Sequence, residues 1–155
     1  MRDENQRAVD LAYRALGQRE RTVVELKAYL EGKRVEPEAI DHAVTELTEA
    51  GFLDDARFAE RFADDKRTLE RWGADRIERV LRRRGIPSDL VAAAIGSQDR
   101  SDELAAALAV LADRMPEPPV DERGRDRAWR MLVRKGYGPE VAYDAVRAHG
   151  SSRAA

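Results

Sequence analysis

The chain of 155 residues contains no cysteine, which excludes disulfide bonds and thiolate metal sites. Its longest apolar run, residues 104–112, is too short to cross a bilayer, so the sequence excludes a membrane-spanning helix. Charged residues make up 37% of the chain, yet the net charge is only −2, so the informative feature is where the two signs lie.

The two signs of charge are separated along the chain. Residues 25–60 hold ten acids and four bases, a net charge of −6. Residues 66–84 hold eight bases and three acids, a net charge of +5. The sequence therefore predicts an electrostatic dipole along its length. The first residues, Met1 to Asn5, form no apolar segment of the kind that opens a secretory signal, so we expect a cytoplasmic protein with no membrane partner.

Three helices are predicted before the first strong glycine break. The first ends at Gly17, and Thr22 with Glu25 forms a capping-box pattern that begins the second. Pro37 suits the first turn of the third helix, because proline lacks only an amide that would be unpaired there, and Gly51 is a natural left-handed terminator. The apolar faces comprise Leu11, Ala12, Ala15, Leu16, Val23, Leu26, Leu30, Ile40, Ala43, Val44 and Leu47.

The next three helices follow a short apolar link. Asp54 can cap the fourth helix, and Asp55 favours its positive end, while Phe52 and Leu53 are expected to avoid water. Gly73 then breaks the chain before a fifth helix. We assign the following residues to the buried faces of the fourth, fifth and sixth helices: Phe58, Phe62, Leu69, Ile77, Val80, Leu81, Val91, Ala94 and Ile95.

A last group of three helices follows Gly96. Leu104, Leu108, Leu111 and Met115 form the apolar stripe of the seventh helix, and a proline-rich linker, residues 116–119, stops it. The eighth helix ends at Gly136. The ninth begins at Pro139, and residues 151–155 read as a frayed tail. No segment alternates with a period of two, so the pattern predicts an all-α protein.

These nine helices form an internal repeat of 51 residues. A shift of 51 aligns Leu30, Leu81 and Leu132, then Lys33, Arg84 and Lys135, then Val35, Ile86 and Tyr137, then Glu38, Asp89 and Glu140, then Val44, Ile95 and Val146. We therefore expect an elongated tandem array of three helix-turn-helix-like repeats, residues 1–52, 53–97 and 98–150. Gly85 and Gly136 occupy the turn where the first repeat has Arg34, so there the second helix is expected to end at Gly32.

The link between the first two repeats, here called the signature segment, carries a family resemblance. Its residues Gly51, Phe52, Leu53, Asp54, Asp55, Ala56, Arg57, Phe58 and Ala59 resemble the Gly-Leu-Leu-Asp-Asp-x-Arg-Tyr/Phe-Ala motif of the RecX family, regulatory proteins of the RecA recombinase. The segments around Arg19, Arg76 and Arg134 resemble the openings and turns of that family's repeats, so that the resemblance extends from Ala8 to His149.

The resemblance implies a regulator, most simply an inhibitor, that binds RecA or its filament on single-stranded DNA and modulates ATPase and strand exchange. We further expect a monomer that uses no cofactor, with single-stranded DNA as a further candidate partner. The resemblance brings no catalytic residues.

The residues themselves give no sign of an enzyme or a metal site. His42 and His149 are isolated, and neither lies at a metal-ligand spacing. Asp54 and Asp55 read as a helix cap rather than a catalytic acid pair, and Gly138 precedes a helix without the lysine of a phosphate loop.

The basic run of the second repeat is the best functional candidate. Arg76, Arg79 and Arg83 lie three or four residues apart and share one helix face, although a solvated face would have a similar pattern. An ordinary solvated helix would interleave acids with its bases, but no acid lies between Glu78 and Asp89. The candidate contacts to RecA or DNA are Arg71, Arg76, Arg79, Arg82, Arg83, Arg84 and Lys135.

Two further interpretations stay open. Trp72 and Trp129 lie among arginines and could stack on a base or on a partner's arginine, although partial burial is the simpler interpretation. The last two helices of each repeat also resemble a helix-turn-helix that reads DNA sequence. Against the latter, residues 88–95 contain no arginine, lysine, asparagine or glutamine, the side chains that most often read base edges.

Overall fold

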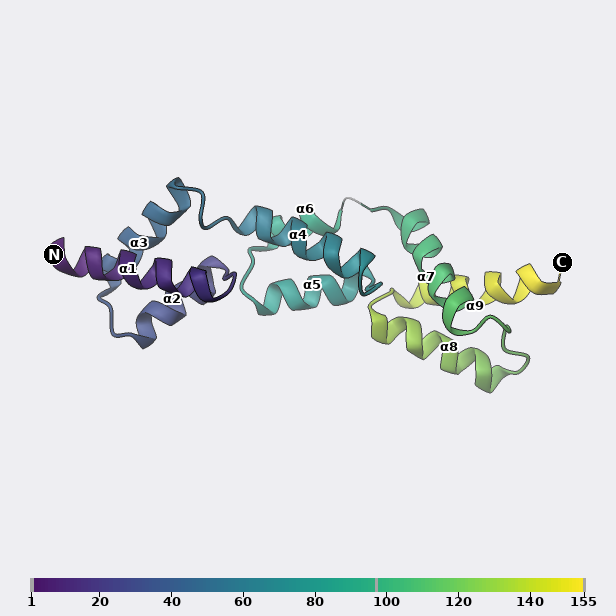
Figure 1. Ribbon diagram of the computed structural model, residues 1–155. Helices are drawn as coiled ribbons and strands as arrows, with labels where there is room; N and C mark the ends of the chain where they lie inside the picture. Colours follow the sequence, from purple (N-terminus) through teal and green to yellow (C-terminus); the bar gives the residue numbers. More distant parts are fainter. Residues whose placement is uncertain (1, 97, 155) are drawn as a thin grey trace. The chain divides into compact units, whose positions relative to one another are not determined.

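The computed structural model of the protein describes the backbone of residues 2–96 and 98–154 and the side chains of residues 3–96 and 98–151. Over these residues every regular element is an α-helix, which confirms the predicted fold class (Figure 1). The nine helices are α1 (Arg2–Gln18), α2 (Val23–Gly32), α3 (Pro37–Glu49), α4 (Asp55–Thr68), α5 (Ala74–Arg83), α6 (Ser88–Ile95), α7 (Arg100–Arg114), α8 (Glu122–Lys135) and α9 (Pro139–Ala154).

The chain divides into two compact units. Unit 1 comprises Met1–Ala59 with Leu81–Val91, and unit 2 comprises Glu60–Val80 with Ala92–Ala155. Helices α4, α5 and α6 therefore contribute to both units. The repeat limits at residues 52 and 97 stay a prediction, and residue 97 lies outside the described residues.

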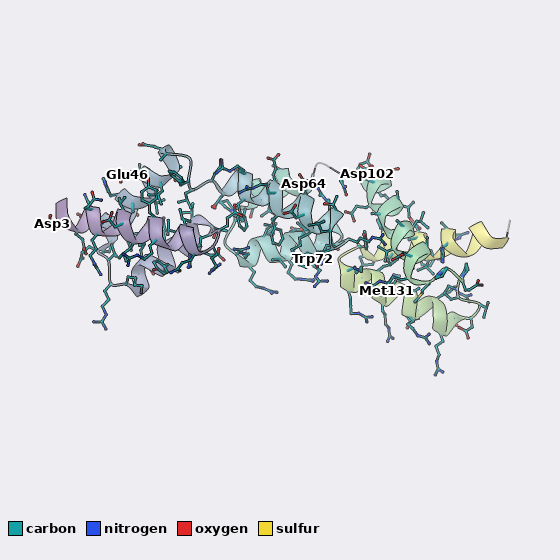
Figure 2. All side chains as sticks on the ribbon, in the orientation of Figure 1. Asp3, Glu46, Asp64, Trp72, Asp102 and Met131 are labelled. Atoms are coloured by element: carbon teal, nitrogen blue, oxygen red, sulfur yellow. The ribbon has the colours of Figure 1, made fainter. Side chains whose placement is uncertain are left out.

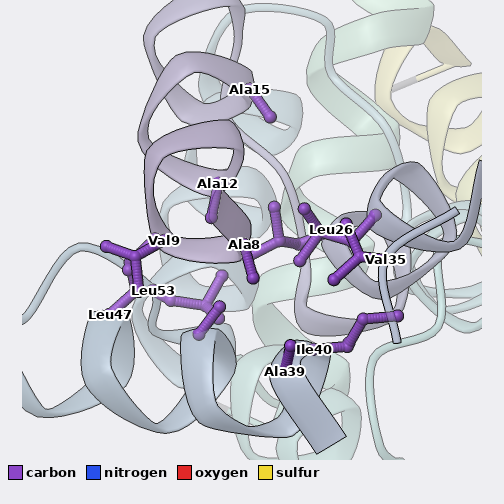
Figure 3. Close-up of a cluster of buried hydrophobic side chains, with 12 residues drawn as sticks. Ala8, Val9, Ala12, Ala15, Leu26, Val35, Ala39, Ile40, Leu47 and Leu53 are labelled. Atoms are coloured by element: carbon purple, nitrogen blue, oxygen red, sulfur yellow. The ribbon is translucent and has the colours of Figure 1, made fainter. Parts of the chain in front are cut away.

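Unit 1 is built around α1 packed against α3, with α2 beside both. Figure 3 shows the apolar side chains of this core gathered between the helices. Its buried members are Ala8, Val9, Ala12, Ala15, Leu26, Leu30, Val35, Ala39, Ile40, Ala43, Leu47 and Leu53. Leu26, Leu30 and Leu47 are fully buried, so truncating any one of them to alanine is expected to cost about 2–5 kcal/mol.

Unit 2 is built around α7 packed against α9, with α8 completing the core. Its buried members are Ala107, Val110, Leu111, Ala128, Leu132, Tyr137, Ala142, Ala145 and Val146. Tyr137 is the largest of them, and its hydroxyl donates to the Arg71 carbonyl oxygen at 2.9 Å, so its polar atom is satisfied. Burial raises the pKa of Tyr137 to about 12, which keeps the hydroxyl a donor at neutral pH.

The three turns that follow α2, α5 and α8 have the same backbone geometry. In each, an amide five residues on donates to a buried leucine carbonyl at 3.1 Å; the pairs are Val35 and Leu30, Ile86 and Leu81, and Tyr137 and Leu132. The residue before each donor has a positive φ, 61° at Arg34, 87° at Gly85 and 105° at Gly136. This is the Schellman arrangement, and its recurrence confirms the repeat predicted from the sequence.

Several local expectations were wrong. Helix α1 continues through Gly17 to Gln18, since an exposed glycine lowers helix propensity without forcing a stop. Phe52 is 59% exposed, because the reversal at Gly51 turns only its neighbour Leu53 into the core. Leu69 is 79% exposed, because α4 ends at Thr68 and the helical periodicity used to place it ends there too. Helix α9 also continues through residues 151–154 of the predicted tail, and residue 155 lies outside the described residues.

Candidate partner-binding surface

Helix α5 holds its arginines in place through an apolar anchor. Ile77 and Leu81 are fully buried, four residues apart, so they fix the rotation of the helix about its axis. Arg79 and Arg83 are exposed and also lie four residues apart, which places them on one outward face of this continuous helix. Arg82 is exposed beside them. These three predicted site residues are therefore exposed, and Arg79 and Arg83 share one face of the helix.

In unit 2, residues distant in the sequence form a cluster of cations around Lys135. Burial lowers the pKa of Lys135, and the positive charges of Arg114, Arg76 and Arg71 lower it further. The Lys135 Nζ donates to the Glu70 carbonyl oxygen at 3.1 Å. The fold thus brings together three residues that the sequence analysis proposed separately, and it adds Arg114, which that analysis missed because this residue ends another helix.

Trp72 lies at the edge of this cluster and is held by cations of its own chain (Figure 2). The Arg76 guanidinium lies 4.0 Å from the centre of the Trp72 ring, and the Lys66 ammonium lies 4.7 Å from it. Phe62 packs edge-on against the same ring at 6.1 Å. The partial burial expected for Trp72 is therefore found, with its ring already stacked inside the unit. Trp129 is also half-buried, and its Nε1 donates to the Pro139 carbonyl oxygen at 3.0 Å.

A backbone contact, here called the Gly73 junction, fixes the position of the cation cluster. The Gly73 amide donates to the Lys135 carbonyl oxygen at 2.8 Å, and the Asp75 amide donates to that of Gly136 at 2.9 Å. A Cβ on Gly73 would lie 2.5 Å from the Gly136 backbone, so the approach requires glycine at residue 73. Next to it, Arg71 has a φ of 59°, a strained conformation for a residue with a side chain.

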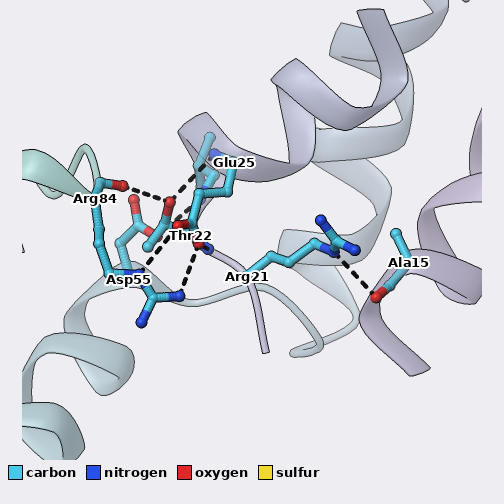
Figure 4. A network of polar contacts seen from close by, with 7 residues as sticks. Ala15, Arg21, Thr22, Glu25, Asp55 and Arg84 are labelled. Carbon is cyan, nitrogen blue, oxygen red and sulfur yellow. Dashed lines mark hydrogen bonds and ion pairs between the residues drawn. The ribbon is translucent and has the colours of Figure 1, made fainter. Parts of the chain in front are cut away.

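Unit 1 holds the matching contact, here called the Thr22 junction (Figure 4). The buried Thr22 hydroxyl donates to the Arg84 carbonyl oxygen at 2.8 Å. The Arg84 guanidinium donates two charge-assisted hydrogen bonds to the Glu25 carboxylate, at 3.0 and 2.9 Å. The same group lies 4.5 Å from the centre of the Phe58 ring. Arg84 was proposed as a partner contact, but its side chain is engaged inside the unit.

The signature segment supplies further contacts of unit 1. The Asp54 carboxylate accepts from the Arg57 amide at 3.0 Å and caps α4, as expected, while Arg57 donates to the Gly51 carbonyl oxygen at 2.8 Å. Asp55 accepts from the Val23 amide at 3.0 Å, so it holds the start of α2 rather than only the start of its own helix. Burial raises the pKa of the Asp55 carboxyl.

The two junctions are related by the same shift of 51 residues that relates the repeats. Thr22 corresponds to Gly73, and Arg84 corresponds to Lys135. In each junction the carbonyl oxygen of a basic residue at the end of one helix accepts a hydrogen bond from the residue just before another helix. The two junctions of the repeated fold therefore depend on Thr22, Gly73 and these two carbonyl oxygens. The side chains of the exposed arginines take no part in them.

The structure also shows a basic surface that the sequence analysis missed. Helix α8 carries five exposed arginines, and four of them, Arg123, Arg127, Arg130 and Arg134, share one face of the helix. The 51-residue shift contains the signal, because it aligns the last three with Arg76, Arg79 and Arg83. Net charge also contains the signal, because α8 has six bases and two acids, but apart from Lys135 the predicted contacts came only from the run at residues 66–84.

The described residues contain neither a metal-binding cluster nor a membrane-spanning helix. No group of three histidine, aspartate or glutamate side chains there is placed to hold a metal ion. No helix in that part of the chain is both long and apolar enough to cross a membrane.

Comparisons with known proteins decide the family. The sequence model of "RecX, first three-helix domain" matches residues 8–47, and that of "RecX, second three-helix domain" matches residues 54–95. The "Regulatory protein RecX" of Deinococcus radiodurans is 34% identical over 93% of this chain and 70% of its own. The chain belongs to the RecX family. The RecX protein of Mycolicibacterium vanbaalenii is 32% identical, over 95% of this chain and 83% of its own.

Solved structures support the same fold. The crystal structure of RecX from Lactobacillus salivarius superposes with a TM-score of 0.84 at 16% identity, covering 97% of this chain and 99% of that one. A second structure, of a regulatory protein RecX, superposes with a TM-score of 0.76 at 19% identity, covering 94% of this chain and 72% of that one. The RecX arrangement of three-helix repeats is thus kept at low sequence identity.

Proposed function

We propose that this protein regulates the RecA recombinase as an inhibitor, binding RecA or its filament on single-stranded DNA and restraining ATPase and strand exchange. The observation that carries this proposal is the match to regulatory RecX proteins over more than nine-tenths of the chain. The matched part includes both junctions and the whole of α5.

The charged surfaces of the chain suggest how such a partner would be bound. The acidic block at residues 25–60 and the basic run at residues 66–84 would face oppositely charged surfaces of the filament. Arg79 and Arg83 are exposed on a helix whose other face is anchored in the core. Guanidinium groups suit either carboxylates of RecA or phosphates of the bound DNA, because they donate in pairs to planar oxyanions.

The test is the ATPase rate of the cognate RecA on single-stranded DNA while this protein is titrated in. A regulator that acts on filaments lowers the ATPase rate even when far fewer than one copy of it is present per RecA. An unchanged rate in excess protein would overturn the proposal.

A charge-reversal variant tests the role of α5. We expect Arg79→Glu with Arg83→Glu to require at least about tenfold more protein for half-inhibition, which corresponds to about 1.4 kcal/mol. Both residues are exposed, so the unfolding transition should stay in place. The control is Arg14→Glu with Arg147→Glu, two exposed sites outside α5 that change the net charge equally. Equal loss in both variants would show that net charge alone matters.

The alternative, a regulator that reads DNA sequence through its helix-turn-helix motifs, lacks a supporting contact surface. Helix α6 (Ser88–Ile95), the candidate recognition helix of the second repeat, contains no arginine, lysine, asparagine or glutamine, the side chains that most often read base edges. A protein that left RecA untouched but bound one duplex sequence over others would establish this alternative instead.

A further inference from the structure

Four of the five exposed arginines of α8 form a single row. Arg123, Arg127, Arg130 and Arg134 follow one another at steps of four, three and four residues, which keeps them on one face of the helix. At a rise of about 1.5 Å per residue the row is about 16 Å long. Ala128 and Leu132, on another face of the same helix, are fully buried, so the core of unit 2 fixes the direction in which the row points.

The surroundings of the row leave it largely uncompensated. The four arginines and Asp126 line an open surface pocket of about 450 Å³. Asp126 is the only acid along that pocket, and its carboxylate pairs with the Arg130 Nε at 3.0 Å. Both side chains of that pair are at least half exposed, so water screens the pair, which is worth little. The lining carries a net charge of about +3, from four guanidinium groups and one carboxylate.

The fold does not require arginine at these places. The equivalents of Arg127, Arg130 and Arg134 in the first repeat are Glu25, Ala28 and Gly32, and that repeat forms the same turn with the same 3.1 Å hydrogen bond. The three-helix unit therefore folds with an acid, a small residue or a glycine where α8 has its row. The shared fold therefore does not account for arginine at these three positions, which favours a role in recognition.

We infer that the row on α8 binds the phosphodiester backbone of a single nucleic-acid strand. A line of guanidinium groups matches a linear polyanion, in which phosphates follow one another at a short repeat, and it binds phosphate without reading bases. A compact acidic patch on a protein would fit a cluster better than a row of this length. One row, rather than two facing rows, suits one strand. The inference goes beyond the proposed regulation of RecA and concerns DNA binding by this protein alone.

The test measures the fluorescence anisotropy of a fluorescein-labelled oligothymidylate, without RecA, over a series of salt concentrations. The variant is Arg127→Gln with Arg134→Gln. The control is Arg125→Gln with Arg147→Gln, two exposed arginines of unit 2 outside the row that remove the same charge. Glutamine keeps helix propensity close to that of arginine, and circular dichroism checks the fold of each variant.

The expected result separates the two variants in affinity and in salt dependence. Each phosphate contact contributes a slope of about −0.7 to log K against log salt, so two lost contacts should make the slope shallower by about 1.4. At about 0.1 M salt this corresponds to about 10- to 30-fold weaker binding. The control should stay within about twofold of the wild type in affinity, and its slope should be unchanged.

Three outcomes would overturn the inference. Equal weakening in both variants would mean that net charge, not the row, attracts DNA. Unchanged DNA binding in the row variant, together with weaker binding to DNA-free RecA, would assign the row to a protein surface. Tighter binding of a duplex than of the single strand, with the same sensitivity to the row, would exclude the single-strand assignment. None of these outcomes depends on whether the protein inhibits RecA.

Discussion

Neighbouring arginines of this chain have different surroundings. Arg83 ends α5 and is exposed, whereas the next residue, Arg84, has its guanidinium bound to Glu25 and lying on the Phe58 ring. Sequence spacing treats both as members of one basic run. Of the two, only Arg84 lies where unit 1 supplies a carboxylate and an aromatic face, so only its replacement should lower stability.

We expect Arg84→Ala to lower the free energy of unfolding by about 1–3 kcal/mol, because it removes two charge-assisted hydrogen bonds from a partly buried carboxylate. The lower end of the range allows for screening, since a quarter of the side chain is exposed. Arg83→Ala is the matched control and should change the free energy of unfolding by less than about 0.5 kcal/mol. Urea unfolding measures both, and equal effects would contradict the assignment.

The Thr22 junction should also make stability depend on pH. Burial alone would raise the pKa of Glu25, but hydrogen bonds from Arg84 and the Thr22 amide outweigh it and hold the pKa below its ordinary value. A carboxyl whose pKa is lowered on folding stabilises the protein above the pKa of the unfolded chain, about 4.3. That contribution is lost as the pH falls through the lower, folded pKa.

We therefore expect Glu25→Gln to cost most near pH 7 and progressively less below about pH 4. The measurement is the difference in unfolding free energy between wild type and variant over that range. Asp55 titrates in both proteins, so the difference largely isolates Glu25. A cost that stays constant with pH would show that the charge of Glu25 contributes nothing.

At the scale of elements, the turns after α2, α5 and α8 have the same backbone geometry, but the residue with positive φ is an arginine in the first and a glycine in the other two. A Cβ on Gly85 would lie 2.6 Å from the Val24 Cβ, so this turn needs glycine for space as well as for its φ of 87°. Gly51 has a similar φ, 82°, but no heavy atom lies within 4 Å of a Cβ built there. Arg34 is exposed, so only its left-handed backbone conformation is unfavourable there.

The comparison of Gly51→Ala with Gly85→Ala separates the two effects. We expect the first to cost about 1–2 kcal/mol, the cost of a left-handed backbone for a residue with a Cβ. The second should cost at least about 1 kcal/mol more, because Val24 must move to make room. Thermal or urea unfolding gives both values. Equal costs would mean that Val24, at the start of α2, moves aside for a Cβ at residue 85 without a loss of stability.

At the scale of the whole molecule, the two signs of charge are distributed unevenly along the sequence. A net −6 at residues 25–60 and a net +5 at residues 66–84 leave the total near zero. Binding that depends on such blocks weakens with salt, because exposed charges are screened within about 8–10 Å at physiological ionic strength.

We accordingly expect the concentration for half-inhibition of the RecA ATPase to rise between about 50 and 200 mM salt. The variant with Arg79→Glu and Arg83→Glu should show a smaller rise, since part of its electrostatic attraction is already lost. RecA alone, assayed at each salt concentration, is the control. A rise of the same size in both proteins would place the salt-sensitive contacts outside α5.

The sequence by itself determined the all-α fold, the 51-residue repeat and the family, because these depend on apolar periodicity, glycine spacing and one specific segment. It also placed Asp54 as a cap and Leu53 in the core. The predictions for Phe52 and Leu69 failed because a turn and a helix end change which way a side chain points. Only the tertiary structure brought Lys135 to Arg71 and Arg84 to Glu25, since those contacts join residues about sixty positions apart. Periodicity describes one helix at a time, whereas a cation's partner depends on which helix the fold places opposite it.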